Sequence, residues 1–269
     1  MCLVVIAYRV HPEFPLVIVS NRDEFFERPT GPLQIWESNP KILAGKDLKA
    51  GGTWLGANSL GKTSFLTNVR NFKKPPHPNP KSRGSLVLDF LKSSKDLSSL
   101  QYREEVLQTA SDYDGFNLFV FDGEVASYIG GDPLQSQILE PGFHAVSNAN
   151  WNTHWPKTEK LKIGVEQLFG SFREGQNWTN QVTQEFFQLL ADSDLVKEDS
   201  FLPDTGIGLE RERYLSSIRI RVPGYGTRAS TLVFYGKDSV EVVERTFSDP
   251  FSNEFTERRE VLEFSETKS

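Results

Sequence analysis

The order of strand-like and helix-like segments is the feature of this sequence that most limits its fold. Segments rich in β-branched and aromatic residues fall into three blocks, and a pair of segments with helical spacing of apolar residues separates each block from the next. A parallel sheet would instead require single strands alternating with single helices. The order therefore predicts an α+β fold in which two mainly antiparallel sheets pack together under outer layers of helices.

The spacing of apolar residues sets the expected bounds of these segments. The first expected strand, Leu3–Tyr8, is apolar on both faces, which is typical of a central strand covered on both sides. A proline-rich stretch, Asn71–Arg83, predicts an exposed loop beside a site. The remaining expected strands are 15–20, 53–57, 63–67, 116–121, 125–129, 144–147, 217–222, 229–235, 240–247 and 256–264. The expected helices are 85–91, 96–109, 158–169 and 179–190.

Length, charge and apolar content exclude several classes of protein. The 269 residues show no repeat or low-complexity linker, so we expect a single domain over 1–269. Net charge is −6, which argues against a general nucleic-acid binder. Neither a secretory signal nor an apolar run of the roughly 20 residues that span a bilayer is evident. We therefore expect a cytoplasmic protein without stable membrane insertion.

The sulfur-containing residues are confined to the first two positions. Met1 is the only methionine and Cys2 the only cysteine, so an internal disulfide is excluded. Removal of Met1 would leave a thiol and a free α-amine on one residue. Because the amine has a pKa of about 7.7–8.0 and the thiol about 8.5, the amine can take the proton of the thiol near neutral pH. The alternative is that Cys2 is a small buried apolar residue.

Polar residues at expected strand ends could complete such a site, because acyl transfer needs oxyanion donors and a group that orients the amine. The candidates are Arg22 and Asp23 after the second strand, Asn68 and Asn148 after later strands, and Arg228 in a glycine-rich segment. Asparagine and aspartate at strand ends also form turns, and an arginine beside an aspartate also forms structural ion pairs. The histidines lack the mutual spacing of metal ligands, so no metal site is expected.

Several short motifs in a fixed order resemble those of the NRDE family, also called the transport and Golgi organisation protein family. The resemblance covers nearly the whole chain. The motifs are Met1-Cys2, Asn21-Arg22-Asp23-Glu24, Gly51-Gly52-Thr53-Trp54, Leu66-Thr67-Asn68, Arg83-Gly84, Gly115-Phe116-Asn117-Leu118, Ser147-Asn148-Ala149, Pro223-Gly224-Tyr225-Gly226-Thr227-Arg228 and Glu244-Arg245-Thr246-Phe247.

This resemblance implies a four-layer αββα sandwich like that of N-terminal-nucleophile hydrolases, which cleave non-peptide amide bonds. It also implies the catalytic set Cys2, Arg22, Asp23, Asn68, Asn148 and Arg228. In the hydrolases the arginine and the aspartate are separated, whereas here they are adjacent. Neighbouring residues of a strand point to opposite faces, so both reach Cys2 only if the chain turns there. Asn21 with Asp23 is the alternative pair.

Two functions follow as hypotheses. In the first, mature Cys2 hydrolyses a non-peptide amide without a cofactor. Asn68 or Asn148 would hold the oxyanion, Asp23 would orient the amine, and Arg22 or Arg228 would bind an acidic group or steady the terminus. In the second, the protein binds or carries a hydrophobic ligand such as haem or an acyl chain, as the family's links to lipid homeostasis, Golgi organisation and haem trafficking imply. Haem would be a ligand only in this second hypothesis.

Overall fold

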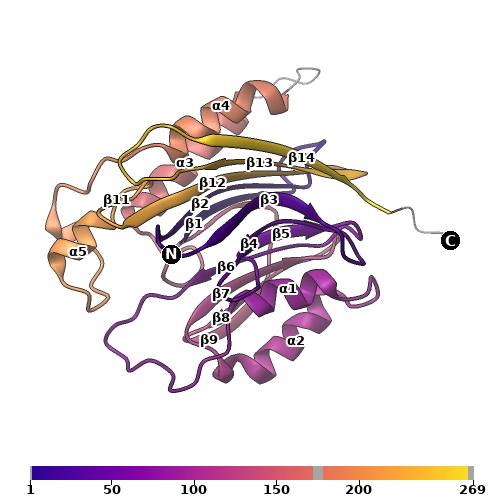
Figure 1. Ribbon diagram of the computed structural model, residues 1–269, viewed down its shortest axis with the longest axis horizontal. Helices are drawn as coiled ribbons and strands as arrows, with labels where there is room; N and C mark the ends of the chain where they lie inside the picture. The colour runs from indigo at the N-terminus through magenta and orange to yellow at the C-terminus, as the bar shows by residue number, and fades with distance from the viewer. Residues whose placement is uncertain (1, 172–177, 266–269) are drawn as a thin grey trace.

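Two antiparallel sheets pack face to face in the computed structural model, which describes residues 2–171 and 178–265 (Figure 1). The first sheet has the order β10-β1-β2-β12-β13-β14, and β11 pairs with the start of β12. Its strands are β1 (Cys2–Tyr8), β2 (Leu16–Phe25), β10 (Gly142–Val146), β11 (Arg221–Val222), β12 (Tyr225–Tyr235), β13 (Ser239–Thr246) and β14 (Thr256–Glu263).

The second sheet is a meander in which strands consecutive in sequence are neighbours in space, from β3 to β9. Its strands are β3 (Thr30–Trp36), β4 (Ile42–Asp47), β5 (Leu55–Asn58), β6 (Thr63–Asn68), β7 (Phe116–Phe121), β8 (Ala126–Gly131) and β9 (Leu134–Ile138). Most of its connections are short, whereas the chain between β6 and β7 runs from 69 to 115 and includes the helices that cover this sheet.

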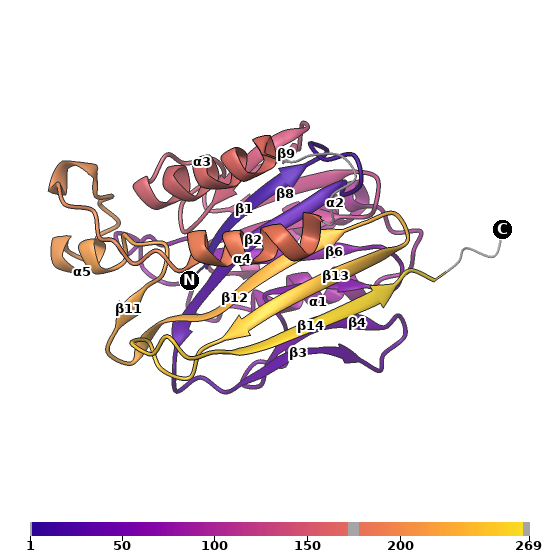
Figure 2. The same cartoon turned by 90° about the horizontal axis from the view of Figure 1, so that it is seen from above.

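Helices cover the outer face of each sheet and complete four layers. Figures 1 and 2 show α3 (Pro156–Gly170) and α4 (Trp178–Leu190) over the first sheet, and Figure 1 shows α1 (Gly84–Lys92) and α2 (Ser99–Thr109) over the second. A short helix, α5 (Leu209–Tyr214), lies beyond the edge of the sandwich. The expected αββα sandwich is confirmed. Among the helices in the described ranges, none is both long enough and apolar enough to cross a membrane.

The sequence of β1 is apolar on both faces because each face packs against a different layer. Leu3 and Val5 pack with Phe186 beneath the helices, whereas Val4 and Ile6 pack between the two sheets. Because side chains alternate along a strand, this assignment also fixes the face of every residue that pairs with β1 in register.

Several expected bounds change in the structure. The segment Asn21–Glu24 does not follow the second strand, because β2 continues through it to Phe25 and pairs with β12 there. The expected strand 217–222 is wrong except for Arg221–Val222, since Ile218 and Ile220 are buried in irregular backbone tied to other segments. Strands β3, β4 and β9 and helix α5 were not expected. Residues 71–83 do form the expected loop, without helix or strand.

The Gly51–Trp54 motif brings two backbone segments into contact. A Cβ atom on Gly52 would lie 2.9 Å from the carbonyl carbon and oxygen of Gly84, at the start of α1. We expect Gly52→Ala to lower the free energy of unfolding by about 1–3 kcal/mol, as overpacking against rigid backbone does. Urea denaturation measures this loss. Gly170→Ala is the matched control, because a Cβ atom there would have no described neighbour within 4 Å. Equal stability of the two variants would contradict the contact.

Candidate active site

Cys2 is buried at the start of β1, on the face between the two sheets. Its side chain shares that face with Val4 and Ile6, because side chains alternate along the strand. Across the ladder it pairs directly with Arg22 of β2. Ser147 Oγ donates a 3.0 Å hydrogen bond to the Cys2 carbonyl oxygen. Burial raises the pKa of the Cys2 thiol, so the thiol keeps its proton at neutral pH.

Arg22 shares the inter-sheet face with Cys2 and is held there by several contacts. Its guanidinium carbon lies 4.0 Å from the centroid of the Trp54 ring. Nη1 donates to Thr30 Oγ1 at 3.2 Å, and Nη2 lies 3.8 Å from the Glu24 carboxylate. A planar guanidinium stacked on an indole ring has little freedom to turn, so Arg22 presents a fixed positive charge beside Cys2.

Asp23 lies on the opposite face of the same strand, because β2 does not turn at this point. Thr227 Oγ1 on β12 donates a 2.7 Å hydrogen bond to Asp23 Oδ1. Burial raises the pKa of the Asp23 carboxyl, and the positive charge of Lys157 is the largest effect that opposes the rise. Asp23 is therefore on the helix side of the sheet. It can act on Cys2 through the main chain at the start of β1, not through the thiol.

Asn21 was the alternative partner for Asp23, and the structure gives it other bonds. Its Nδ2 donates to the carbonyl oxygens of Leu190 and Ile218 at 2.9 and 3.0 Å. Its Oδ1 accepts a 2.6 Å hydrogen bond from Ser230 Oγ. These bonds join β2 to the end of α4 and to β12, so Asn21 has a structural role.

A buried ionic network lies behind Asp23. Lys157 in the first turn of α3 is 3% exposed, and its Nζ donates a 3.1 Å hydrogen bond to the Leu215 carbonyl oxygen. Burial lowers the pKa of Lys157 to about 8, although the negative charge of Asp23 opposes this. Arg70 and Glu212 form an ion pair of 2.6 Å with both side chains buried. Sequence reasoning missed these residues, which come from separate segments of the chain.

The two candidate asparagines lie together and have different roles in the structure. Asn148 Nδ2 donates a 2.9 Å hydrogen bond to the main-chain oxygen of Asn68, and Asn148 Oδ1 lies 3.2 Å from Ser147 Oγ, which shares its one proton between Asn148 and the Cys2 carbonyl oxygen. Both polar ends of Asn148 are therefore engaged. The side-chain amide of Asn68 makes no hydrogen bond to another described residue and lines a cavity. Asn68 is thus the better placed of the two to bind a ligand, and Asn148 positions it.

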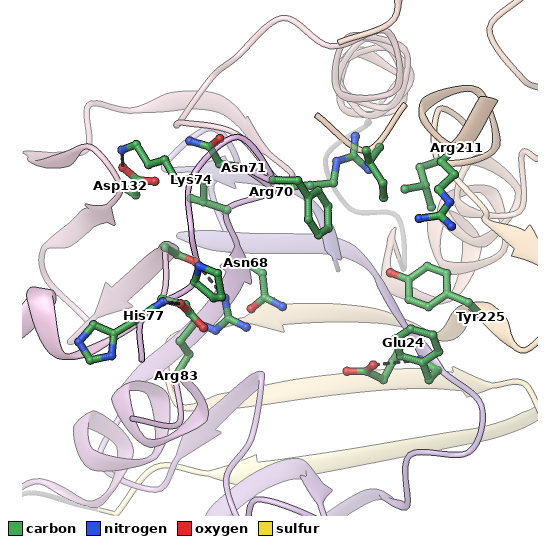
Figure 3. Close-up of a pocket in the computed structure, with 18 of the residues that line it drawn as sticks. Glu24, Asn68, Arg70, Asn71, Lys74, His77, Arg83, Asp132, Arg211 and Tyr225 are labelled. Atoms are coloured by element: carbon green, nitrogen blue, oxygen red, sulfur yellow. Dashed lines mark hydrogen bonds and ion pairs between the residues drawn. The ribbon is translucent and has the colours of Figure 1, made fainter. Parts of the chain in front are cut away.

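A cavity of about 880 Å³ is lined by residues of β2, β6, β12 and the loop 71–83 (Figure 3), and Cys2 is not among its lining residues. Strand β1 begins at Cys2, while β2 continues to Phe25 and β12 begins opposite it at Tyr225, so the longer strands wall the space that β1 leaves free. Ionisation of Cys2 would raise the pKa values of Arg83 and Tyr225, which both line this cavity. Other lining residues include Glu24, Asn68, Arg70, Phe72, His77 and Arg211.

Arg228 does not line this cavity. It sits where β12 has a register shift, and its Nη1 donates to the carbonyl oxygens of Phe25, Phe26 and Arg28 at 3.4, 3.1 and 2.5 Å. Together with Arg22 it borders a second cavity of about 490 Å³. Arg228 therefore fixes the segment that follows β2.

Arg83 and Tyr225 are further site residues that sequence reasoning missed, although both lie inside the motifs Arg83-Gly84 and Pro223–Arg228. Their place in these motifs was the one sequence feature that could have marked them as site residues.

Within residues 2–171 and 178–265, no group of three or more His, Cys, Asp or Glu side chains is arranged to hold a metal ion.

The protein is an αββα sandwich in which polar side chains gather at the start of a central strand. The model of the family described as Transport and Golgi organisation 2 matches residues 1–249, and the chain belongs to that family. A Transport and Golgi organization protein 2 homolog of Bos taurus is 33% identical over 273 residues, covering 93% of this chain and 95% of that protein. The homolog of Homo sapiens is 32% identical over 274 residues, covering 93% and 94%. The resemblance inferred from the motifs is confirmed.

Solved structures of hydrolases show a partial likeness to this chain. Penicillin V acylase from Agrobacterium tumefaciens has a TM-score of 0.48 and 10% identity, covering 90% of this chain and 82% of that one. A mutant conjugated bile acid hydrolase from Clostridium perfringens has a TM-score of 0.49 and 8% identity, covering 100% and 98%.

The buried Lys157 gives a pH-dependent prediction. Its pKa of about 8 in the folded chain lies below the ordinary value of 10.5. Between these two values the unfolded chain binds more protons, so raising the pH through this window stabilises the fold. We expect the stability difference between the wild type and Lys157→Met to shift in favour of the wild type from pH 8 to 10, by up to about 1.4 kcal/mol per pH unit. Urea denaturation at several pH values measures it. A difference that stays flat would show that Lys157 has an ordinary pKa in the folded chain.

Proposed function

We propose that this protein is a cysteine amidohydrolase in which Cys2, exposed by removal of Met1, attacks a non-peptide amide. The observation that carries the proposal is the position of Cys2. The only thiol of the chain begins a buried central strand directly opposite Arg22, and Glu24 and Phe25, further along β2, line a cavity of about 880 Å³. Met1 lies outside the described residues, so its removal is part of the proposal.

The reaction needs only groups that the chain supplies. The free α-amine of Cys2 takes the thiol proton, and sulfur forms a bond to the amide carbonyl carbon. The resulting tetrahedral intermediate collapses as the C–N bond breaks, and the amine passes the proton to the leaving nitrogen. Water then attacks the thioester, which releases the acid and restores the thiol. Because burial raises the pKa of the thiol, the thiol depends on the amine for its activation.

The surrounding residues have complementary roles in this proposal. Asn68 faces the cavity and donates to the oxyanion, while Asn148 holds Asn68 in place through its main-chain oxygen. Asp23 lies on the face away from the thiol and orients the α-amine. The fixed charge of Arg22 lies on the thiol side and favours the negative charge that develops at sulfur and oxygen. Arg228 steadies the segment after β2.

The first test combines intact-mass analysis with an acylating probe. We expect the mature protein to lack Met1 and to release nitrophenol from p-nitrophenyl octanoate in a burst, leaving an octanoyl group on the protein. Because the chain has one cysteine, the thioester has one location. Cys2→Ala should lower the acylation rate by at least about 10³-fold, as removal of a catalytic nucleophile does. N-octanoyl-p-nitroanilide then tests hydrolysis of an amide.

A variant with leucine inserted between Met1 and Cys2 is the matched control. It keeps the thiol but places its nitrogen in a peptide bond, so iodoacetamide should label the thiol after denaturation, while the folded variant fails to form the acyl-enzyme. Retention of Met1 in the wild type would end the proposed mechanism, as would acylation that survives Cys2→Ala.

A second candidate function is the binding of a hydrophobic ligand, because the same cavity exposes aromatic side chains. Phe25 and Phe72 are 54% and 61% exposed, and Tyr214 is 44% exposed. Exposed aromatic residues around one cavity are typical of an apolar binding site. His77 also borders this cavity and provides an imidazole that could ligate haem iron. The word transport in the family's description is compatible with this function.

Haem titration tests this second function. If haem binds through His77, its Soret band should shift on addition of the protein, and His77→Ala should weaken binding by about tenfold or more, which is about 1.4 kcal/mol. His154→Ala is the control, because His154 is 81% exposed and does not border the cavity. A spectrum that does not change with added protein would exclude haem as the ligand.

A further inference from the structure

Arg83 carries a positive charge that the described chain does not neutralise. It is partly buried on the wall of the cavity of about 880 Å³, and none of the described carboxylates forms an ion pair with it. Its Nη1 donates a 3.0 Å hydrogen bond to the carbonyl oxygen of Gly115, which also accepts one from the main-chain nitrogen of Val69 at 2.9 Å. Burial lowers the pKa of Arg83, and the negative charges of Asp114 and Glu24 oppose this only in part.

The helix that follows makes a positive charge unfavourable at this position. Arg83 is the N-cap residue of α1, its side chain makes no capping hydrogen bond, and the first turn contains no acidic residue. Short polar or acidic residues are favoured there, because the N-terminus of a helix has free N–H groups and a partial positive charge. A neutral side chain could donate the same bond to Gly115, so the fold alone does not explain the charge.

The other cationic residues that line this cavity differ from Arg83. Lys74 and Arg70 form ion pairs of 2.5 and 2.6 Å with an aspartate and a glutamate. Arg211 has no described ion pair, but its side chain is exposed, and water solvates an exposed charge. Figure 3 shows Arg211 on the far side of the cavity from Arg83.

The acidic residues of the cavity do not supply the partner that Arg83 lacks. Asp132 pairs with Lys74, and Asp114 Oδ1 accepts a 2.9 Å hydrogen bond from the main-chain nitrogen of His77. The carboxylate of Glu24 lies 3.8 Å from each of two arginine side chains outside the cavity. An acidic group from a bound molecule would therefore complete the pairing of charges in this cavity.

The cavity also exposes apolar surface. The side chains of Phe25 and Phe72 line it and are largely exposed. Its volume lies within the range of about 300–1,000 Å³ that is typical of small-molecule sites. Exposed aromatic rings beside an unpaired cation match a ligand that has both an apolar part and an acidic group.

We propose that this cavity binds an amphipathic anion whose acidic group pairs with Arg83 and whose apolar part packs on Phe25 and Phe72. The inference rests on the second candidate function, ligand binding, and specifies its ligand, and it requires no contact with Cys2. A guanidinium group binds a carboxylate or a phosphate monoester through paired N–H···O bonds, so both head groups share the required chemistry.

Calorimetric titration of the wild type with three probes of equal chain length tests the acidic group. The probes are decanoate, decyl phosphate and 1-decanol, each kept below the concentration at which it forms micelles. We expect one of the two anions to bind at least about tenfold more tightly than 1-decanol, because the alcohol cannot form the charge-assisted hydrogen bonds. The anion that binds more tightly identifies the head group as carboxylate or phosphate.

Arg83→Gln tests the residue. Glutamine keeps an N–H donor for the Gly115 carbonyl oxygen and removes the charge. The affinity for the preferred anion should fall by about tenfold or more, and the affinity for 1-decanol should change little. The thermal midpoint without ligand checks that the variant is folded. If it is not, the comparison of probes on the wild type still tests the head group.

The double variant Lys74→Gln/Asp132→Asn is the matched control. It removes a cation from the same cavity together with its partner, so the net charge of the cavity is unchanged. Its affinity for the preferred anion should equal that of the wild type. Arg211→Gln examines the remaining unpaired cation, and a larger loss there than with Arg83→Gln would overturn the assignment to Arg83.

The outcomes separate this inference from the proposed functions. If the anions and 1-decanol bind with equal affinity, the acidic group is overturned while ligand binding stands. If an anion binds more tightly than 1-decanol but Arg83→Gln binds it as the wild type does, the role of Arg83 is overturned. If none of the three probes binds, the inference is overturned, and the haem titration alone then decides the binding function. Acylation of Cys2 is measured separately and does not depend on any of these results.

Discussion

The difference in length between β1 and its neighbours is the constraint on which the rest of the site depends. β1 begins at Cys2, which pairs with Arg22, whereas β2 continues to Phe25 and there pairs with Tyr225 of β12. Main-chain groups of β2 beyond Arg22 thus have a partner strand on one side and open space on the other. Glu24 and Phe25 of β2 and Tyr225 of β12 line the cavity at this end of the sheet, and Cys2 lies at the same end without lining it.

Strand alternation then divides the polar residues between two faces. Arg22 joins Cys2 on the inter-sheet face, and Asp23 joins Lys157 on the helix face. In the proposed mechanism, each face stabilises a different state of the reaction. A fixed guanidinium favours the charge that develops at the thiol, while a carboxylate on the other face can hold an amine at the start of the strand. Within that mechanism, two adjacent residues would serve the thiol and the α-amine of Cys2 without competing for the same position.

Burying the charged residues behind this site costs free energy of folding, and the fold alone does not require these charges. Arg70, Glu212, Lys157 and Asp23 are all nearly inaccessible to solvent, and burying charge is unfavourable unless each is paired. Replacing such buried charges by apolar residues of similar volume often leaves the free energy of unfolding unchanged or raises it. The network lies between the α3 layer and the cavity wall, since Arg70 also lines the cavity. The network therefore connects α3 to the wall of the cavity. A role in the proposed site would explain why these charges are buried.

The fold was largely predictable because it rests on periodicity, whereas the site depends on where strands end. Helices such as α4 follow from apolar residues at helical spacing, and β7 (Phe116–Phe121) from a run of apolar residues. The extension of β2 was missed because Asn21 to Glu24 is polar and resembles a turn in sequence. Asn21 and Asp23 are buried beside partners distant in sequence, such as Thr227, Ser230 and Lys157. No local pattern reports such partners, so Cys2 and the asparagines could be proposed from sequence, but the faces of Arg22 and Asp23 could not.

The protonation of the thiol links the two candidate functions. A thiol whose pKa is raised by burial is a weak nucleophile until a base removes its proton. Within the proposed mechanism that base is the α-amine, because Asp23 lies on the other face and Arg22 cannot accept a proton. With Met1 attached, the nitrogen of Cys2 is an amide and the cavity can only bind. With Met1 removed, the same cavity gains its base. Processing at the first peptide bond would thus decide whether this site binds a ligand or cleaves it.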